Sequence, residues 1–327
     1  MTKKTKIIFF LILIIQVLIV ISLLLDIYLK QNKTFSRISI TPLNRENISY
    51  PPKKFSNLNY FYELKPNTIL LEKPDWLTYT ATYTINKDGL NERFDYSTAK
   101  APDVYRIITL GDSFTFGQFV NTPDNWPEKL EDLFQTTSYC KHKKLEVINL
   151  GVPGYDLEYA VARLKLRGIK YDPDMVIWFV KTDDFTQNNE IMKPTIDKYR
   201  EEFKHSDSYT LKDYSYAIKA EKETNDKFGK EAILNRQIEI LKSISNIFKN
   251  ELVLLTFPFT SQNYKRIMTD FANSNPKTYF YDNLPNIEGS NMSSSQLPDG
   301  HPSVEGHKLI AASVFEYLKT NKLISCQ

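Results

Sequence analysis

A serine in a short polar turn is the first residue of this chain whose position suits chemistry. Ser113 follows an apolar run at 104–110 and comes directly after Gly111 and Asp112. The branched residues of the run predict a buried strand that the turn residues end. A serine between a strand and a helix can offer its backbone N–H to a developing oxyanion and its hydroxyl to a substrate. The alternative is that Ser113 only caps a helix or turn, because Gly, Asp and Ser are ordinary turn residues, so a nucleophile needs partners elsewhere.

A nucleophilic serine needs a base within hydrogen-bond reach and an acid that orients the base. Three of the four histidines lie in a lysine-rich turn, a charged segment or a predicted helix, namely His142, His205 and His307. His301 differs, because Asp299 precedes it by two residues in a loop that enters a helix. Residues i and i+2 of extended backbone project to the same side, so we expect Asp299 to reach one ring nitrogen and Ser113 the other.

The elements that must position these residues alternate between strand and helix. Strands are predicted at 104–110, 145–150, 175–180, 252–257 and 278–281. Helices are predicted at 124–134, 157–167, 233–248, 264–272 and 303–318. This alternation indicates an α/β domain with a parallel sheet and helices on both faces. Strand ends and helix entrances collect at one edge of such a sheet, so Ser113 and His301 are expected to meet there.

The amino-terminal region predicts a membrane anchor. Residues 7–25 form a nearly unbroken apolar run, about the length that an α-helix needs to cross a bilayer. Three lysines precede the run and favour an inside amino terminus, although basic residues on the other flank weaken this preference. No small-x-small cleavage pattern follows, so we predict an uncleaved single-pass anchor with an extracytoplasmic catalytic domain. A buried soluble helix is the alternative.

Three regions are therefore expected. Residues 1–30 form the cytoplasmic tip and transmembrane anchor, and 31–102 a stalk and an extended segment that packs on the main domain. Within that segment, 57–62 and 77–85 predict short strands, and Gly89 the positive-φ position of a turn. The main domain spans 103–322 and contains a polar insertion at 184–230, which is too long for an ordinary connection. We expect the insertion to be partly helical and either a lid or a solvated excursion.

Composition excludes several classes of function. The net charge is +3, and no basic block with interleaved aromatic residues indicates nucleic-acid binding. The sequence has neither a phosphate-cradling glycine loop nor a ligand cluster, so we expect no nucleotide cofactor and no metal. Cys140 and Cys326 lack metal-site spacing, and whether they pair cannot be decided from the sequence.

These motifs resemble the sequence blocks of the SGNH, or GDSL-like, hydrolase superfamily. The tripeptide 111–113 resembles the first block, 149–154 the second and 299–303 the last, and the resemblance spans 105–318. The Asp-x-His spacing of the last block is similar to that of alginate-O-acetylation-related members. The resemblance implies a three-layer α/β/α, flavodoxin-like fold. It also implies a catalytic triad of Ser113, His301 and Asp299.

The resemblance further implies an oxyanion hole made by the backbone N–H groups of Ser113 and Gly154, with Gly151 as second choice, and by an asparagine of the third block. The family pattern there is Gly-x-Asn-Asp, whereas this chain has Lys-Thr-Asp-Asp at 181–184, so Asp183 takes the place of the asparagine. An ionised carboxylate cannot donate, and losing one such donor costs about 3 kcal/mol, or 10²–10³ in rate. Three outcomes stay open: a protonated Asp183, a donor from Gln187 or Asn188, or a slow enzyme.

We therefore expect a membrane-anchored extracytoplasmic serine esterase without cofactors. Its partners would be an acyl ester of a cell-envelope carbohydrate or lipid and, through the amino-terminal helix, the membrane. The first alternative is an O-acyltransferase that moves acetyl groups to an envelope polysaccharide. The second is a non-catalytic member of the same fold that binds glycan.

Overall fold

A five-stranded parallel sheet forms the centre of the protein. The computed structural model describes residues 16, 39–42, 48–49, 58–137, 139–140, 143–203, 215–287 and 294–326. The strands lie side by side in the order β10 (Thr278–Tyr281), β9 (Glu251–Leu255), β8 (Met175–Phe179), β6 (Val104–Leu110) and β7 (Lys144–Asn149). Numbered along the chain, this is the flavodoxin-like order 2-1-3-4-5. The α/β prediction with a central parallel sheet is confirmed.

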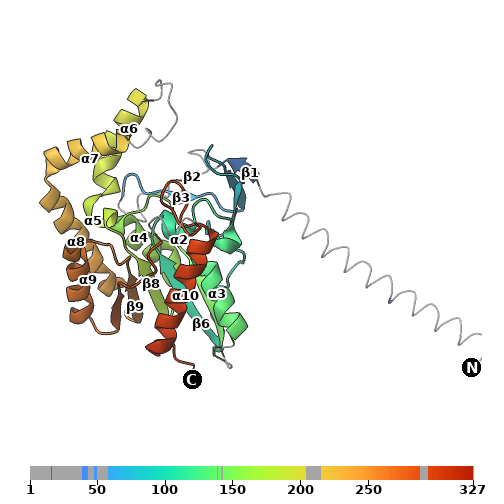
Figure 1. Cartoon of the computed structure of the whole chain (residues 1–327). Helices are drawn as coiled ribbons and strands as arrows, with labels where there is room; N and C mark the ends of the chain where they lie inside the picture. Colours follow the sequence, from blue (N-terminus) through green and yellow to red (C-terminus); the bar gives the residue numbers. More distant parts are fainter. Residues whose placement is uncertain are drawn as a thin grey trace, which may run out of the picture.

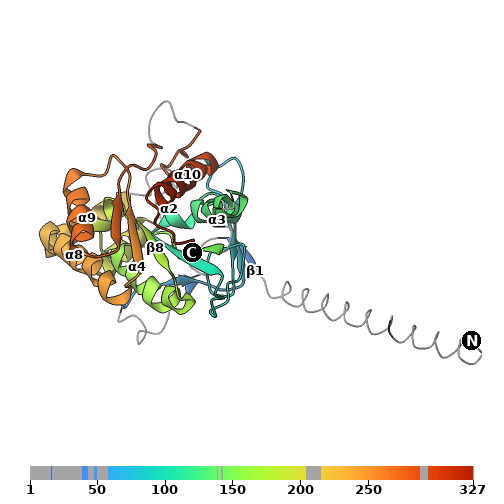
Figure 2. The same ribbon diagram turned by 90° about the horizontal axis from the view of Figure 1, so that it is seen from below.

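Helices cover both faces of the sheet (Figures 1 and 2). One face packs against α3 (Trp126–Thr137) and α10 (Val304–Thr320). The other packs against α4 (Leu157–Arg163), α8 (Lys230–Ile247) and α9 (Gln262–Ser274). In α3, buried Trp126, Leu130 and Phe134 recur every four residues and form the apolar stripe that faces the sheet. These helices fix the strand ends from which the site is built.

The amino-terminal segment differs from its prediction. Residues 58–62 form no strand, because the backbone N–H groups of Asn59 and Tyr60 donate to the Glu190 carboxylate instead of to a neighbouring strand. The predicted strand at 77–85 is reduced to β5 (Ala81–Ile85). The described residues upstream of it form β1 (Ser39–Pro42), β2 (Ile48–Ser49), β3 (Glu63–Leu64) and β4 (Thr68–Glu72). The strands β1, β4 and β5 make a second, small sheet, and β2 pairs with β3.

Buried charge fastens this segment to the main domain. The Glu63 carboxylate accepts hydrogen bonds from Arg163 and Arg167. Glu63 and Arg163 are both almost fully buried. Removing one partner of such an ion pair would leave the other as an uncompensated buried charge. The contact therefore holds the segment against α4, close to the second sequence block.

The predicted insertion contains α5 (Asp183–Thr186), α6 (Asn189–Phe203) and α7 (Ser215–Phe228). The partly helical character expected from its sequence is confirmed. Figure 1 shows α6 and α7 projecting from the body on the side where the strands of the sheet end. A role as a lid stays a prediction.

The predicted anchor at 7–25 lies outside the described residues except for Gln16. Within the described part of the chain, no helix has the length and apolar character of a membrane span.

Cys140 and Cys326 form a disulfide that closes a loop with a sequence separation of 186 residues. A cross-link over such a loop removes conformations from the unfolded chain, and native disulfides typically contribute about 2–5 kcal/mol. We expect the C140S/C326S variant to unfold at lower urea concentration, with a free energy of unfolding lower by that amount. Urea titration monitored by circular dichroism measures it, with dithiothreitol-treated wild type as the comparison. Equal midpoints for the variant and the untreated wild type would contradict the expectation.

His307 makes the fold sensitive to acid. It is fully buried in α10, and its Nδ1 accepts a hydrogen bond from the Trp126 backbone N–H at 3.2 Å. Burial, with a smaller effect of nearby His301, lowers the pKa of His307 from 6.5 to about 3. The unfolded chain then binds the proton more tightly, so stability that is present above pH 6.5 is lost as the pH falls towards 3.

We expect the His307→Asn variant, whose amide oxygen can replace Nδ1 as acceptor, to lose less stability on acidification than the wild type. The difference in slope is at most about 1.4 kcal/mol per pH unit. Denaturant unfolding at several pH values between 3 and 7 measures it. Burial raises the pKa of Glu131 to about 7 and that of Asp156 to about 6, which opposes the trend equally in both proteins. Parallel curves would contradict the expectation.

Candidate active site

Ser113 is the first residue of α2 (Ser113–Phe116), directly after β6. The cap of this helix is Asp112, whose Oδ1 accepts the Phe114 N–H at 2.9 Å. The alternative that Ser113 itself is the cap is therefore wrong, and its hydroxyl is available for another partner. The turn requires Gly111, which has a φ of 150° and whose added Cβ would lie 2.3 Å from the Thr115 Oγ1.

The partner of the Ser113 hydroxyl is His301. Its Nε2 lies 2.8 Å from the Ser113 Oγ, although the two residues are 188 positions apart. Its Nδ1 lies 2.8 Å from the Asp299 Oδ2, and the Asp299 Oδ1 accepts the His301 backbone N–H at 3.2 Å. The structure thus brings all three residues of the predicted triad together. Serine, imidazole and carboxylate in this sequence of contacts can transfer a proton away from the hydroxyl.

The loop reaches this arrangement through a turn and not through the extended backbone assumed from the sequence. The Gly300 N–H donates to the Leu297 carbonyl at 2.9 Å, and Gly300 has a φ of 97°. In such a turn, a residue with positive φ is usually glycine. The turn folds Asp299 back beneath His301, so both of its oxygens face that residue.

Two aromatic rings hold the imidazole. The ring centroids of Phe114 and Phe119 lie 5.0 and 5.1 Å from that of His301. The His301 side chain is 14% exposed and the Asp299 side chain 5%, so the acid is shielded while the base reaches the surface. This difference suits a base that must contact substrate and an acid that must only contact the base.

The backbone donors distinguish the two candidate glycines. The Gly151 N–H donates to the Asn149 Oδ1 at 2.9 Å and is occupied. Among the described residues, neither the Ser113 N–H nor the Gly154 N–H donates to another group. The Gly154 carbonyl accepts from the Asn189 side-chain amide at 2.7 Å, which fixes the loop. In the part of the chain that the structure describes, one backbone donor after β6 and one after β7 are therefore without a partner.

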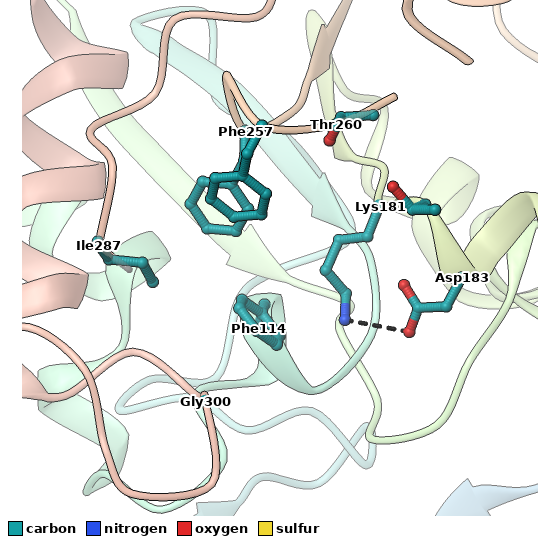
Figure 3. Close-up of a pocket in the computed structure, with 9 residues that line it drawn as sticks. Phe114, Lys181, Asp183, Phe257, Thr260, Ile287 and Gly300 are labelled. Carbon is teal, nitrogen blue, oxygen red and sulfur yellow. Dashed lines mark hydrogen bonds and ion pairs between the residues drawn. The ribbon is translucent and has the colours of Figure 1, made fainter. Parts of the chain in front are cut away.

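The segment after β8 carries charge where the resemblance implies an amide. The Lys181 Nζ lies 3.3 Å from the Asp183 Oδ2 and 4.0 Å from the centre of the Phe114 ring (Figure 3). It also lies 2.8 Å from the Asp112 Oδ2. Burial alone would lower the pKa of Lys181, but the surrounding carboxylates outweigh it and hold that pKa above its usual value. Lys181 is therefore a cation throughout the neutral pH range.

Gln187 and Asn188 are the two residues considered as substitutes for the missing amide donor. The Asn188 amide donates to the Glu158 Oε2 at 2.8 Å, and Asn188 does not line the pocket that contains Asp183. The Gln187 carbonyl accepts from the Gln237 amide, which ties this end of α5 to α8. Next to Asp183, burial and two nearby carboxylates raise the pKa of Asp184 well above its ordinary value. Asp184 accepts the Lys181 backbone N–H at 2.7 Å and so shapes the turn.

A pocket of about 170 Å³ is lined in part by Phe114, which follows Ser113 in the chain, and by Gly300, which lies between Asp299 and His301 (Figure 3). Its apolar wall consists of Phe114, Phe257, Phe259 and Ile287. The remaining lining residues are Lys181, Thr182, Asp183, Thr260 and Gly300. The Phe257 and Phe259 rings stack with centroids 4.8 Å apart, and Phe259 is 47% exposed at the rim. The pocket thus joins an apolar surface to a charged one.

Sequence reasoning did not identify several residues of this site. Lys181 was noted only as a departure from a pattern, although a lysine directly after a buried strand at the sheet edge is itself a signal. Phe257 and Phe259 follow β9 and could have been found by the same edge rule. Glu72 could not, because it comes from β4 of the small sheet. It interacts electrostatically with His301 and Asp299, and burial raises its pKa.

The sequence model of the GDSL-like Lipase/Acylhydrolase family matches residues 107–314. This range includes the last four residues of β6, all of β7, β8, β9 and β10, and the three residues of the predicted triad. The chain belongs to this family. It is accordingly an ester hydrolase of the SGNH type, as GDSL-like hydrolases are also called.

Solved structures of GDSL-like hydrolases resemble the chain at low sequence identity. A lipase/acylhydrolase from Enterococcus faecalis is 16% identical, with a TM-score of 0.42, covering 66% of this chain and 96% of that one. A putative lipolytic protein from Desulfitobacterium hafniense is 20% identical, with a TM-score of 0.38, covering 64% and 98%. A family 3 carbohydrate esterase from Clostridium thermocellum is 13% identical, with a TM-score of 0.39, covering 68% and 100%. A search of curated proteins found no match.

Proposed function

We propose that the chain is a serine esterase in which Ser113, His301 and Asp299 form the catalytic triad. The observation that supports this most is the chain of two 2.8 Å contacts from the Ser113 Oγ through the imidazole to the Asp299 carboxylate. The Oγ attacks the ester carbonyl carbon as its proton passes to the His301 Nε2. The imidazolium returns that proton to the leaving alcohol, and an acyl-serine forms. Water, deprotonated by His301, then releases the acid and restores the serine.

The negative charge of the tetrahedral intermediate would be held by the Ser113 and Gly154 backbone N–H groups. Both groups lie at the carboxyl edge of the sheet and are without other partners among the described residues. Preorganised donors of this kind stabilise charge that develops in the transition state without reorganising. The Gly151 N–H takes no part, because Asn149 already accepts it.

The pocket supports a short acyl ester as substrate. At about 170 Å³ it is smaller than the 300–1,000 Å³ typical of pockets for drug-sized ligands. A long fatty acyl chain would extend past Phe259 into solvent, whereas an acetyl group fits beside Phe114. We propose acetyl and other short acyl esters of an envelope carbohydrate or lipid. Hydrolysis of p-nitrophenyl octanoate faster than of the acetate would contradict this size limit.

The reaction is tested with the full chain in detergent. A fluorophosphonate should form a bond between its phosphorus and the Ser113 Oγ, expel fluoride and abolish hydrolysis of p-nitrophenyl acetate. Mass spectrometry of the digest should place the adduct on the peptide that contains Ser113. An adduct elsewhere, or continued hydrolysis after labelling, would contradict the proposal. Transfer of the acyl group to an added glycan in preference to water would instead support the acyltransferase.

We further propose that the apolar run at 7–25 anchors the chain and that the catalytic domain is extracytoplasmic. The run has the length of a membrane span, and the disulfide between Cys140 and Cys326 is typical of an oxidising compartment. The full chain should stay with membranes after carbonate extraction. A protease added outside intact cells from which any outer barrier has been removed should digest the catalytic domain. Recovery in the soluble fraction with free thiols would contradict both parts.

A further inference from the structure

The pocket beside Ser113 contains a charge arrangement that the proposed mechanism does not use. Asp183 lines the pocket with a side chain that is 48% exposed. A carboxylate there would oppose the negative charge that forms on the substrate oxygen, because like charges close together in a partly buried site repel strongly. An enzyme with this residue therefore needs a compensating cation.

Lys181 is placed to provide this compensating cation. Its ammonium group contacts two carboxylates, at 2.8 Å from Asp112 and 3.3 Å from Asp183. The Phe114 ring, 4.0 Å away, supports the cation from below through its negative face. Asp112 and Phe114 are the two sequence neighbours of Ser113, so the ammonium lies against both residues that flank the nucleophile.

We propose that Lys181 is a positioning residue that acts through Asp183: its ammonium pairs with and orients that carboxylate, so that the oxyanion forms beside an ion pair and not beside an unpaired carboxylate. This inference rests on the proposed role of Ser113 as nucleophile. It assigns a function to the lysine that stands at the first position of the third block. It also explains how an aspartate is tolerated where the resemblance implies an amide donor.

A double-mutant cycle over Lys181 and Asp183 tests the coupling. In the wild-type background we expect Lys181→Met to lower kcat for p-nitrophenyl acetate about 100-fold, comparable to loss of one oxyanion donor, with KM changed by less than about threefold. In the Asp183→Asn background the carboxylate is absent, and the same substitution should lower kcat less than about tenfold. Lys181→Arg, which keeps the charge, should retain most of the activity.

Lys100 offers a matched control. Its side chain is 16% exposed, as is that of Lys181, and its Nζ lies 2.8 Å from Asp174 and 3.1 Å from Asp172 at the other end of the sheet. Lys100→Met therefore removes an equally buried lysine from two aspartates without touching the pocket. Its effect on kcat should be small and equal in both backgrounds.

Two kinds of result would overturn the inference. One is an equal loss from Lys181→Met in both backgrounds, and the other is a loss no larger than that of Lys100→Met. Fluorophosphonate titration counts folded active sites in every variant, so misfolding is corrected for. If Lys181→Met does not accumulate as folded protein, Lys181→Gln enters the same cycle. Full activity of Ser113→Ala would refute the proposed function itself, which the cycle alone cannot do.

Discussion

Replacing Ser113 by alanine is expected to lower kcat for p-nitrophenyl acetate by about 10⁴–10⁶-fold, with KM nearly unchanged. The substitution removes the atom that lies 2.8 Å from the His301 Nε2 and that would form the acyl bond. The backbone N–H of residue 113 and the Gly154 N–H remain, so weak stabilisation of the oxyanion should persist. Steady-state kinetics with purified full chain in detergent measure the effect.

The matched control is Ser243→Ala. Its hydroxyl donates to the Ile240 carbonyl within α8, far along the chain from the nucleophile. This variant should keep wild-type kcat, because it loses a serine hydroxyl without touching the triad. Activity of Ser113→Ala within tenfold of wild type would mean that another group attacks the ester, and the triad assignment would fail.

The reactive residues could be predicted because each lies at a strand or helix end with a local signature. Ser113 follows the buried run that becomes β6, and the structure reproduces the predicted bounds of that strand. His301 was selected by its acid neighbour and by its place before a helix. Local sequence does not show that Ser113 and His301 lie close together. Their proximity was predicted from the rule that strand ends and helix entrances share one edge of the sheet.

What could not be predicted depends on contacts between distant segments. Residues 58–62 have the composition of a strand, but Glu190, about 130 positions later, accepts their backbone N–H groups. The pairing of Cys140 with Cys326 likewise follows from where α3 and the carboxyl-terminal residues lie together, with the two Cα atoms 5.1 Å apart. Neither contact has a local signal.

The charged side of the pocket likewise depends on contacts that the sequence could not predict. The sequence indicated that Asp183 replaces an amide donor, which suggested a weaker enzyme. It did not show that the Lys181 side chain folds back over Phe114 to contact both Asp112 and Asp183. Lysine has many rotamers, and its direction was decided by two carboxylates and a ring brought together by β6 and β8.

Replacing Asp299 by asparagine is expected to lower kcat by about 10³–10⁴-fold with little change in KM. The Asp299 Oδ1 accepts the His301 backbone N–H at 3.2 Å, and Oδ2 faces Nδ1 at 2.8 Å. An asparagine keeps its oxygen on the backbone N–H, so its NH₂ points at Nδ1. The imidazole must then carry its proton on Nε2, where it cannot accept the Ser113 proton. Steady-state kinetics measure the loss.

Asp226→Asn is the control for this substitution, because the Asp226 carboxylate pairs only weakly with solvent-exposed Lys222 on α7 and its side chain is 65% exposed. It should keep wild-type kinetics. Circular dichroism should show that Asp299→Asn retains the fold, since the turn needs an acceptor for the His301 N–H and the amide oxygen still provides one. If Asp299→Asn were as active as Asp226→Asn, the carboxylate would serve only the turn, and the imidazole would take its orientation from Phe114 and Phe119 alone.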